Sequence, residues 1–98
     1  MDRFRALPRV ELLGLEACVA ATPLARLLGL ALLDRDRVPE ALLIPRCRAV
    51  HTFGMRFALD VVFVDRGGRI VEIRRPVPPR RLAHCPTADA VLEIPAAR

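Results

Sequence analysis

The sequence predicts a mainly β protein with one α-helix, an α+β fold class. Apolar and polar residues alternate over a long stretch of the second half, which is the pattern of a strand with one face on a core. A single segment in the first third shows helical spacing of apolar residues instead. Paired glycines and a proline-rich stretch separate further apolar runs, as turns and loops do between strands.

The composition indicates one packed domain over residues 1–98. Of these residues, 53% are hydrophobic and 28% are charged, which is far from the composition of a disordered chain. The sequence contains no internal repeat and no linker long enough to divide it. We therefore expect a single hydrophobic core.

The first elements expected along the chain are a strand over residues 9–13 and a helix at about residues 22–33. Thr22 can cap the free N–H groups of the helix, and Pro23 is tolerated in its first turn. An apolar stripe at helical spacing should pack the helix on a sheet; its members are Leu24, Leu27, Leu28, Ala31 and Leu32. Gly29 within the helix suggests the close approach of another backbone.

The remaining elements are strands. They are expected over residues 41–44, 47–64, 69–74 and 90–94. A hairpin turn should lie at residues 65–68, because Gly67 and Gly68 can supply the positive φ of a tight turn. Residues 75–80 should form a loop, since their prolines remove backbone donors.

The strand expected over residues 47–64 is the most informative element. Its odd positions are almost wholly apolar and should face the core: Cys47, Ala49, His51, Phe53, Met55, Phe57, Leu59, Val61 and Phe63. Its even positions carry the polar side chains, and Arg48, Thr52, Arg56 and Asp60 should share the opposite face. A bulge at Gly54 would reverse the register of every residue before it.

Two acidic residues interrupt apolar runs. Asp60 should be buried and therefore paired, and Arg26 of the helix is a better partner than Arg56, which is too distant along a straight strand. The pair could fix the fold, or the carboxylate could orient a ligand. Glu93 alternates with Leu92 and Ile94, so we expect it to face solvent.

The basic residues indicate anionic partners. The formal net charge is +5, and residues 46–98 hold ten arginines against five acidic residues. Such an excess attracts anions without identifying them. The composition argues against nucleic acid as a partner despite the pairs Arg74-Arg75 and Arg80-Arg81, because the chain has no Trp or Tyr on which bases could stack.

Cysteine and histidine provide two further possibilities. Cys47, His51, His84 and Cys85 make a Cys2His2 set by composition, but residues four apart on a straight strand lie about 13 Å from each other, too far for one ion. We therefore expect no metal and no cofactor. A nucleophile pair of His51 with Cys47 or Cys85 lacks a recognisable third group.

The sequence predicts a cytoplasmic protein. Glu11 and Glu16 interrupt the apolar N-terminal stretch, which makes it a poor export signal. The apolar segment at residues 27–33 is far short of the roughly 20 residues that span a bilayer. The three cysteines should then be reduced thiols.

Residues 51–65, which read HTFGMRFALDVVFVD, and residues 68–71, which read GRIV, resemble the signature of domain-of-unknown-function family 192. Residues 26–30 resemble the helical Arg-x-x-Gly-Leu element of that family, and residues 91–96 its closing strand. The resemblance extends from about residue 20 to the end of the chain. It implies a small jelly-roll-like β sandwich or barrel of mostly antiparallel strands with the helix packed on it, and it implies no activity.

These observations favour a non-enzymatic binding or accessory module for a small anionic ligand or a partner protein. The candidate ligand-binding residues are Arg26, Arg48, His51, Thr52, Arg56 and Asp60. The first alternative is an enzyme or metal-binding protein that uses His51 with Cys47 or Cys85, and the second is a nucleic-acid-binding protein. The place of His51 discriminates between the first two, because a core-facing ring favours the binding module and a cleft-facing ring beside a cysteine favours chemistry.

Overall fold

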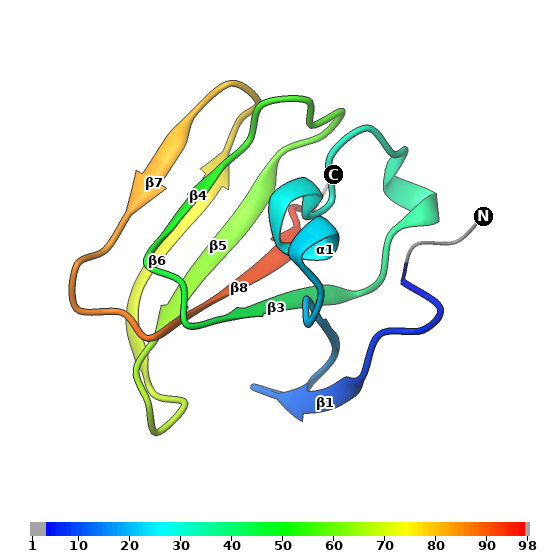
Figure 1. Cartoon of the computed structure of the whole chain (residues 1–98). Coiled ribbons are helices and arrows are strands. Elements are labelled where there is room, and N and C mark those ends of the chain that lie inside the picture. Colours follow the sequence, from blue (N-terminus) through cyan, green and yellow to red (C-terminus); the bar gives the residue numbers. More distant parts are fainter. Residues whose placement is uncertain (1–3, 98) are drawn as a thin grey trace.

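The computed structural model describes residues 4–97, and the prediction of a mainly β fold with one α-helix is confirmed for them (Figure 1). The elements are β1 (Arg9–Leu12), β2 (Leu15–Val19), α1 (Pro23–Leu28), the 3-10 helix η1 (Arg35–Arg37), β3 (Ala41–Pro45), β4 (Ala49–His51), β5 (Leu59–Val64), β6 (Ile70–Val77), β7 (Leu82–His84) and β8 (Ala90–Pro95). Residues 1–3 and 98 lie outside the described part of the chain.

The strands form two sheets. Six of them pair in the order β1-β2-β3-β8-β5-β6, and β4 pairs with β7 in a separate two-stranded sheet. All pairs are antiparallel except β2 with β3, which confirms the expectation of mostly antiparallel strands. The large sheet keeps β1 and β6 as its edges, so it is not a closed barrel.

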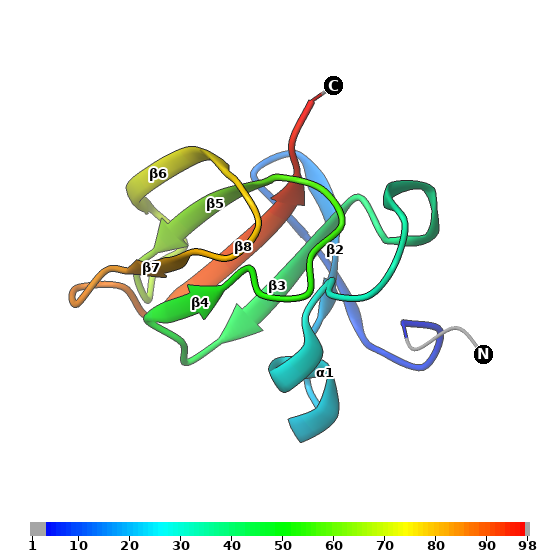
Figure 2. The same ribbon diagram turned by 90° about the horizontal axis from the view of Figure 1, so that it is seen from above.

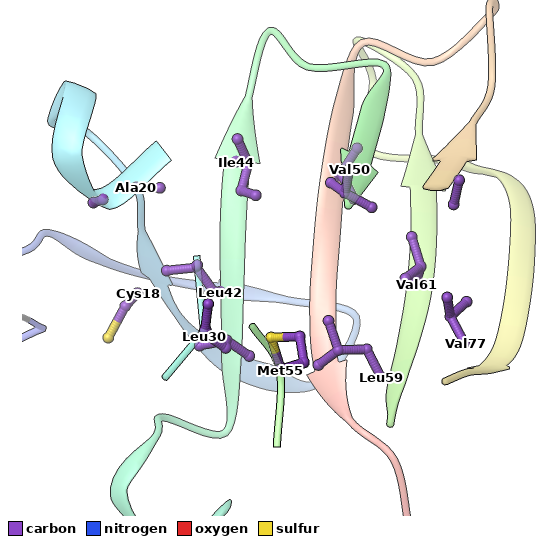
Figure 3. Packing of buried hydrophobic residues seen from close by; sticks show 14 of the residues in the cluster. Cys18, Ala20, Leu30, Leu42, Ile44, Val50, Met55, Leu59, Val61 and Val77 are labelled. Carbon is purple, nitrogen blue, oxygen red and sulfur yellow. The ribbon is translucent and has the colours of Figure 1, made fainter. Parts of the chain in front are cut away.

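The main core lies between the large sheet and a layer made of α1, the turn after it and the β4–β7 sheet (Figures 2 and 3). The large sheet contributes, among others, Leu42, Ile44, Leu59, Val61, Phe63 and Val91. The covering layer contributes Ala25, Leu30, Val50 and Ala83, and the loop after β4 adds Met55. This layer is the part of the fold that carries the candidate site described below.

A second apolar cluster occupies the opposite face of the large sheet. It consists of Ala17, Ala41, Val62, Val64, Ala90 and Leu92. A Cβ placed on Gly68, in the turn between β5 and β6, would lie 3.6 Å from Leu12 of β1. The sheet is therefore curved enough to bring one end close to the other, and this curvature helps to bury the second cluster.

Helix α1 is shorter than predicted. Its start is as expected, because the Thr22 hydroxyl accepts a hydrogen bond from the Ala25 N–H at 3.0 Å. It ends at Leu28, since Gly29 adopts φ +53°, a conformation that favours glycine. The predicted apolar stripe is wrong: Leu24 and Leu27 are 60% and 68% exposed, and the turn after Gly29 carries the chain into the core instead.

The strand predicted over residues 47–64 is also wrong. Residues 52–58 form a loop, and the two flanking strands, β4 and β5, belong to different sheets. Gly54 in this loop has φ +81°, and the register reverses there. After Gly54 the odd positions are buried as predicted, as Met55 and Phe63 illustrate, whereas before it Val50 is buried and His51 is exposed.

The other strands differ from the prediction mainly at their ends. Strand β6 continues to Val77, so part of the predicted loop at residues 75–80 is strand, and β2 and β7 were not predicted. The hairpin turn at residues 65–68 is confirmed. Its Asp65 carboxylate accepts hydrogen bonds from the N–H groups of Gly67 and Arg69, both at 2.9 Å.

Candidate functional site

Two adjoining hollows lie beside α1 and β4. The inner cavity has a volume of about 60 Å3 and is lined by Arg26, Leu27, Leu28, Gly29, Leu30, Ile44, Cys47, Ala49, Val50, His51, Met55 and Glu93. The outer hollow is larger, about 580 Å3, and more open; it is lined by Arg26, Arg46, Cys47, Arg48, Ala49, His84 and Asp89. Because Arg26, Cys47 and Ala49 line both, the two hollows adjoin, and together they form the candidate site.

Glu93 is the most unusual residue of the inner cavity. Its side chain is only 3% exposed, and its Oε1 atom has no hydrogen-bond partner among residues 4–97. Burial raises the pKa of this carboxyl to about 7. The prediction of solvent exposure is wrong because β8 lies inside the large sheet, between β3 and β5, and both faces of that sheet carry buried apolar clusters.

Gly29 makes room for this carboxyl. A Cβ at position 29 would lie 2.9 Å from Glu93 Oε1, closer than real Cβ contacts allow. The sequence predicts a close approach at Gly29, but the group that approaches is a side chain and not a backbone. The turn after α1 and the carboxyl of β8 are therefore packed directly on each other.

Arg26 does not pair with Asp60, so that prediction is wrong. Its guanidinium donates hydrogen bonds to the carbonyl oxygen of Pro45 and, at 3.3 Å, to that of Arg46, which ties α1 to the end of β3. Asp60 is half-buried on β5, and no described residue forms an ion pair with it. It alternates with the residues of the main core, so it lies on the other face of the large sheet from the inner cavity.

Two other predicted site residues also lie away from the hollows. Thr52 is fully buried, and its hydroxyl donates to the Pro78 carbonyl at 2.6 Å and accepts from the Arg81 N–H at 2.9 Å. Arg56 forms an ion pair with Asp34 at 3.1 Å on the surface. The common polar face expected for the even positions therefore does not form, because the chain turns at Gly54.

The structure does bring three of the predicted residues together. Arg26 lines both hollows, Arg48 lines the outer hollow, and His51 lines the inner cavity. The Arg48 Nε donates to the carbonyl of Ala88 at 3.2 Å, which fixes its stem beside the loop before β8. Sequence reasoning missed Arg46, which lies just before the predicted strand over residues 47–64, and proposed His84 only as a metal ligand.

His51 lines the inner cavity. Its side chain is exposed, and its ring centre lies 5.9 Å from that of Phe53. Cys47 lines the same cavity, and its thiol donates to the Ala49 carbonyl at 3.0 Å. Cys85, in contrast, is buried and within 3.6 Å of the Thr87 hydroxyl. His51 is therefore not core-facing, and it shares a cavity with Cys47. No hydrogen bond among the described residues joins the ring to the thiol, so the criterion given above is met only in part.

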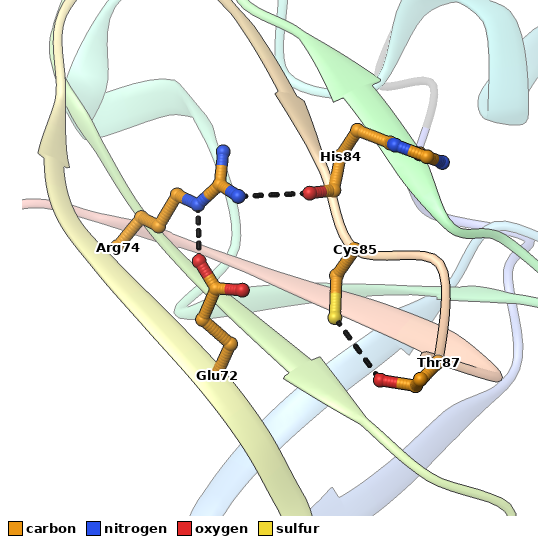
Figure 4. A network of polar contacts seen from close by, with 5 residues as sticks. All are labelled: Glu72, Arg74, His84, Cys85 and Thr87. Carbon is orange, nitrogen blue, oxygen red and sulfur yellow. Dashed lines mark hydrogen bonds and ion pairs between the residues drawn. The ribbon is translucent and has the colours of Figure 1, made fainter.

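The described part of the chain offers no set of ligands for a metal ion. Residues 4–97 contain no group of three or more His, Cys, Asp or Glu side chains arranged to hold an ion. His84 and Cys85 point away from each other, as expected for neighbours on an extended chain (Figure 4).

A polar network ties β6 to β7 (Figure 4). Arg74 of β6 forms an ion pair with Glu72 and donates to the His84 carbonyl at 2.8 Å. The hydrogen bond from Arg74 lowers the pKa of the Glu72 carboxyl. Arg74 is thereby occupied within the fold, which removes one arginine from the basic pairs that could have bound nucleic acid.

The charge balance of the outer hollow is positive. Three arginines, Arg26, Arg46 and Arg48, and the imidazole of His84 line it together with a single carboxylate, that of Asp89. Guanidinium groups bind carboxylates and phosphates through paired, charge-assisted hydrogen bonds. The outer hollow is therefore suited to an anion, whereas the inner cavity presents the carboxyl of Glu93.

The fold resembles that of a protein of unknown function from Novosphingobium aromaticivorans DSM 12444, known from a crystal structure. The two share 17% sequence identity with a TM-score of 0.64 over 94% of this chain and 84% of that one, a likeness that concerns the fold alone. No curated protein matches the sequence significantly. Among residues 4–97, no helix is long and apolar enough to cross a membrane. The model of the DUF192 family, described as "Uncharacterized ACR", matches residues 9–98, and the chain therefore belongs to this family.

Proposed function

We propose that the protein is a binding module for a small anionic ligand, which the outer hollow receives. The observation that carries this proposal is the convergence of three arginines from two segments on one open hollow: Arg26 from α1, and Arg46 and Arg48 from the connection between β3 and β4. Positive charges that line one hollow repel one another in the free protein. An anion that neutralises them would stabilise the site.

The arginines keep donors available for a ligand. Each guanidinium has five N–H donors. Arg26 uses its two terminal nitrogens on the carbonyls of Pro45 and Arg46, and Arg48 uses its Nε on Ala88. Arg46 makes no side-chain hydrogen bond with a described residue, so its whole guanidinium is available to an anion.

The double variant Arg46→Gln/Arg48→Gln is expected to bind a simple anion at least about tenfold more weakly than the natural protein, because a hydrogen bond to a charged group contributes about 1.5–3 kcal/mol. The affinities for inorganic phosphate and for malonate would be measured by NMR titration, which also locates the residues that respond. The matched control is Arg66→Gln/Arg69→Gln, which removes the same charge from the turn between β5 and β6. Equal weakening in both double variants would show a non-specific charge effect and would refute the site.

A second candidate function is thiol chemistry at Cys47, because His51 and Cys47 line the same cavity. If His51 activates this thiol, Cys47 should react with iodoacetamide faster than glutathione does at the same pH, and the variant His51→Gln should remove the difference. Mass spectrometry of the labelled protein would identify the cysteine that has reacted. A rate for Cys47 no faster than that of glutathione, unchanged in His51→Gln, would leave the binding module as the proposed function.

A further inference from the structure

The carboxyl of Glu93 needs a hydrogen-bond partner that the fold itself does not provide. Its Oε1 atom is buried and accepts no hydrogen bond from residues 4–97. Native proteins rarely leave a buried polar atom unsatisfied, because the loss of its hydrogen bonds to water costs free energy. Glu93 lines a cavity of about 60 Å3, which has room for a small polar group of a ligand.

The other side chains around this cavity do not supply the missing donor. Most of them are apolar: Leu27, Leu28, Leu30, Ile44, Val50 and Met55. The polar ones are Arg26, Cys47 and His51. Arg26 donates to the carbonyls of Pro45 and Arg46, and Cys47 donates to that of Ala49. No described residue forms an ion pair with Glu93.

We propose that the inner cavity receives the ammonium group of a dipolar ligand whose anionic group lies on the arginines of the outer hollow. The ligand class is an amino carboxylate or an amino phosphate. This inference rests on the proposed function, since the outer hollow holds the anionic end. The two hollows share Arg26, Cys47 and Ala49 in their linings, so the proposed ligand would lie across these residues.

An ammonium group suits Glu93 better than a neutral donor does. A buried carboxylate is stable only when it is paired and hydrogen-bonded, and a cation supplies both the charge and the donors. The apolar walls strengthen this pairing, because electrostatic interactions are stronger where water is excluded. A ligand with an anionic group alone would leave the Oε1 atom unsatisfied.

The test is a series of straight-chain amino acids with increasing separation of their charged groups: glycine, β-alanine, 4-aminobutyrate and 5-aminopentanoate. Each is compared at pH 8 with the carboxylate of the same length that lacks the amine. At the length that matches the site, we expect the amino compound to bind at least about tenfold more tightly, as a charge-assisted hydrogen bond would give. A second pair, 2-aminoethyl phosphate and ethyl phosphate, decides whether the anionic end is a phosphate.

The variant Glu93→Gln tests whether Glu93 causes the preference for the amino compound over the amine-free acid. The ratio of the two affinities should fall to about one in this variant, whereas the control Glu72→Gln should keep the natural ratio, because Glu72 lies on β6 and is paired with Arg74. NMR spectra of the free variants establish that each is folded. The series on the natural protein needs no variant and tests the ligand class by itself.

The two proposals fail in different ways. If the amine-free acids bind in a manner that depends on Arg46 and Arg48, but no amino compound is preferred at any length, the ammonium site is refuted and the anion site stands. Hydroxy acids that bind as tightly as the amino acids would also refute the ammonium site. If neither series binds, and phosphate binds equally well to the natural protein and to Arg46→Gln/Arg48→Gln, the proposed function fails and the ammonium site with it.

Discussion

Glu93→Gln is expected to stabilise the free protein at pH 8 by about 3 kcal/mol and to change its stability little at pH 4. The pKa of Glu93 is raised from 4.5 to about 7 in the folded protein by burial. Each tenfold difference in proton affinity between the folded and unfolded states corresponds to about 1.4 kcal/mol. Glutamine has a similar shape and never ionises, so the variant avoids the cost of a buried charge.

The sign of the effect follows from proton binding. Between pH 4.5 and about 7 the unfolded chain has lost the proton of Glu93 and the folded chain keeps it, so stability falls as the pH rises through this range. Above pH 7 both states are ionised, and the loss is complete. Below pH 4.5 both are protonated, and Glu93 makes no difference to the free energy of unfolding.

Urea unfolding of both proteins at pH 4, 5, 6, 7 and 8 would measure this difference. The matched control, Glu72→Gln, should show the opposite slope, because the hydrogen bond from Arg74 lowers the pKa of Glu72 and the stability it contributes is lost as the pH falls. A difference between Glu93→Gln and the natural protein that stays constant across the pH range would contradict the buried position of this carboxyl.

The sequence predicts the features of the fold that depend on local chemistry. The Thr22 cap and the Asp65 turn depend on side chains within a few residues of the backbone groups they bind, and both are present. The alternation after Gly54 is also read correctly, since Met55 and Phe63 are buried. The family resemblance supports the mainly β prediction over most of the chain, because its motifs are spread along it. The family itself is confirmed.

The sequence does not predict features that depend on which strands become neighbours. The alternation of apolar residues is compatible with one long strand or with two strands joined at Gly54, and the choice depends on the pairing of β4 with β7. The burial of Glu93 depends on β8 lying between β3 and β5. Glu93 is the single charged residue of β8 (Ala90–Pro95), and a lone charge among apolar residues can indicate a buried carboxyl. The same pattern is, however, typical of an edge strand with one face in water.

The same distinction between local features and features that depend on strand pairing applies to the candidate site. Arg26, Arg48 and His51 are predicted and do line the hollows, but not for the predicted reasons. Arg48 does not share a strand face with Thr52, and Arg26 does not pair with Asp60. Arg46 and Glu93 are missed, since the hollows are built from α1, the connection between β3 and β4, and β8. These segments are far apart in the sequence and meet only through the long-range pairing of the large sheet.

Gly29→Ala is expected to lower the free energy of unfolding by about 3 kcal/mol, for two separable reasons. The backbone at position 29 has φ +53° and ψ −126°, a conformation that costs an L-residue roughly 1–3 kcal/mol. In addition, the new methyl group would lie 2.9 Å from Glu93 Oε1, so the buried carboxyl would have to move. Urea unfolding at pH 5, where Glu93 is protonated in the folded protein, would measure the total.

Two comparisons separate these contributions. Gly14→Ala places a methyl group at φ +78° with nothing within 4 Å, so its cost is backbone strain alone. In the Glu93→Ala background, Gly29→Ala should likewise cost only its strain, which makes the two substitutions less than additive by about 1 kcal/mol. Equal costs at positions 14 and 29, with full additivity, would mean that Gly29 is required only for its turn. A measured coupling would instead show that the turn after α1 and the Glu93 carboxyl are held together, so that a ligand bound to the carboxyl would also act on the turn.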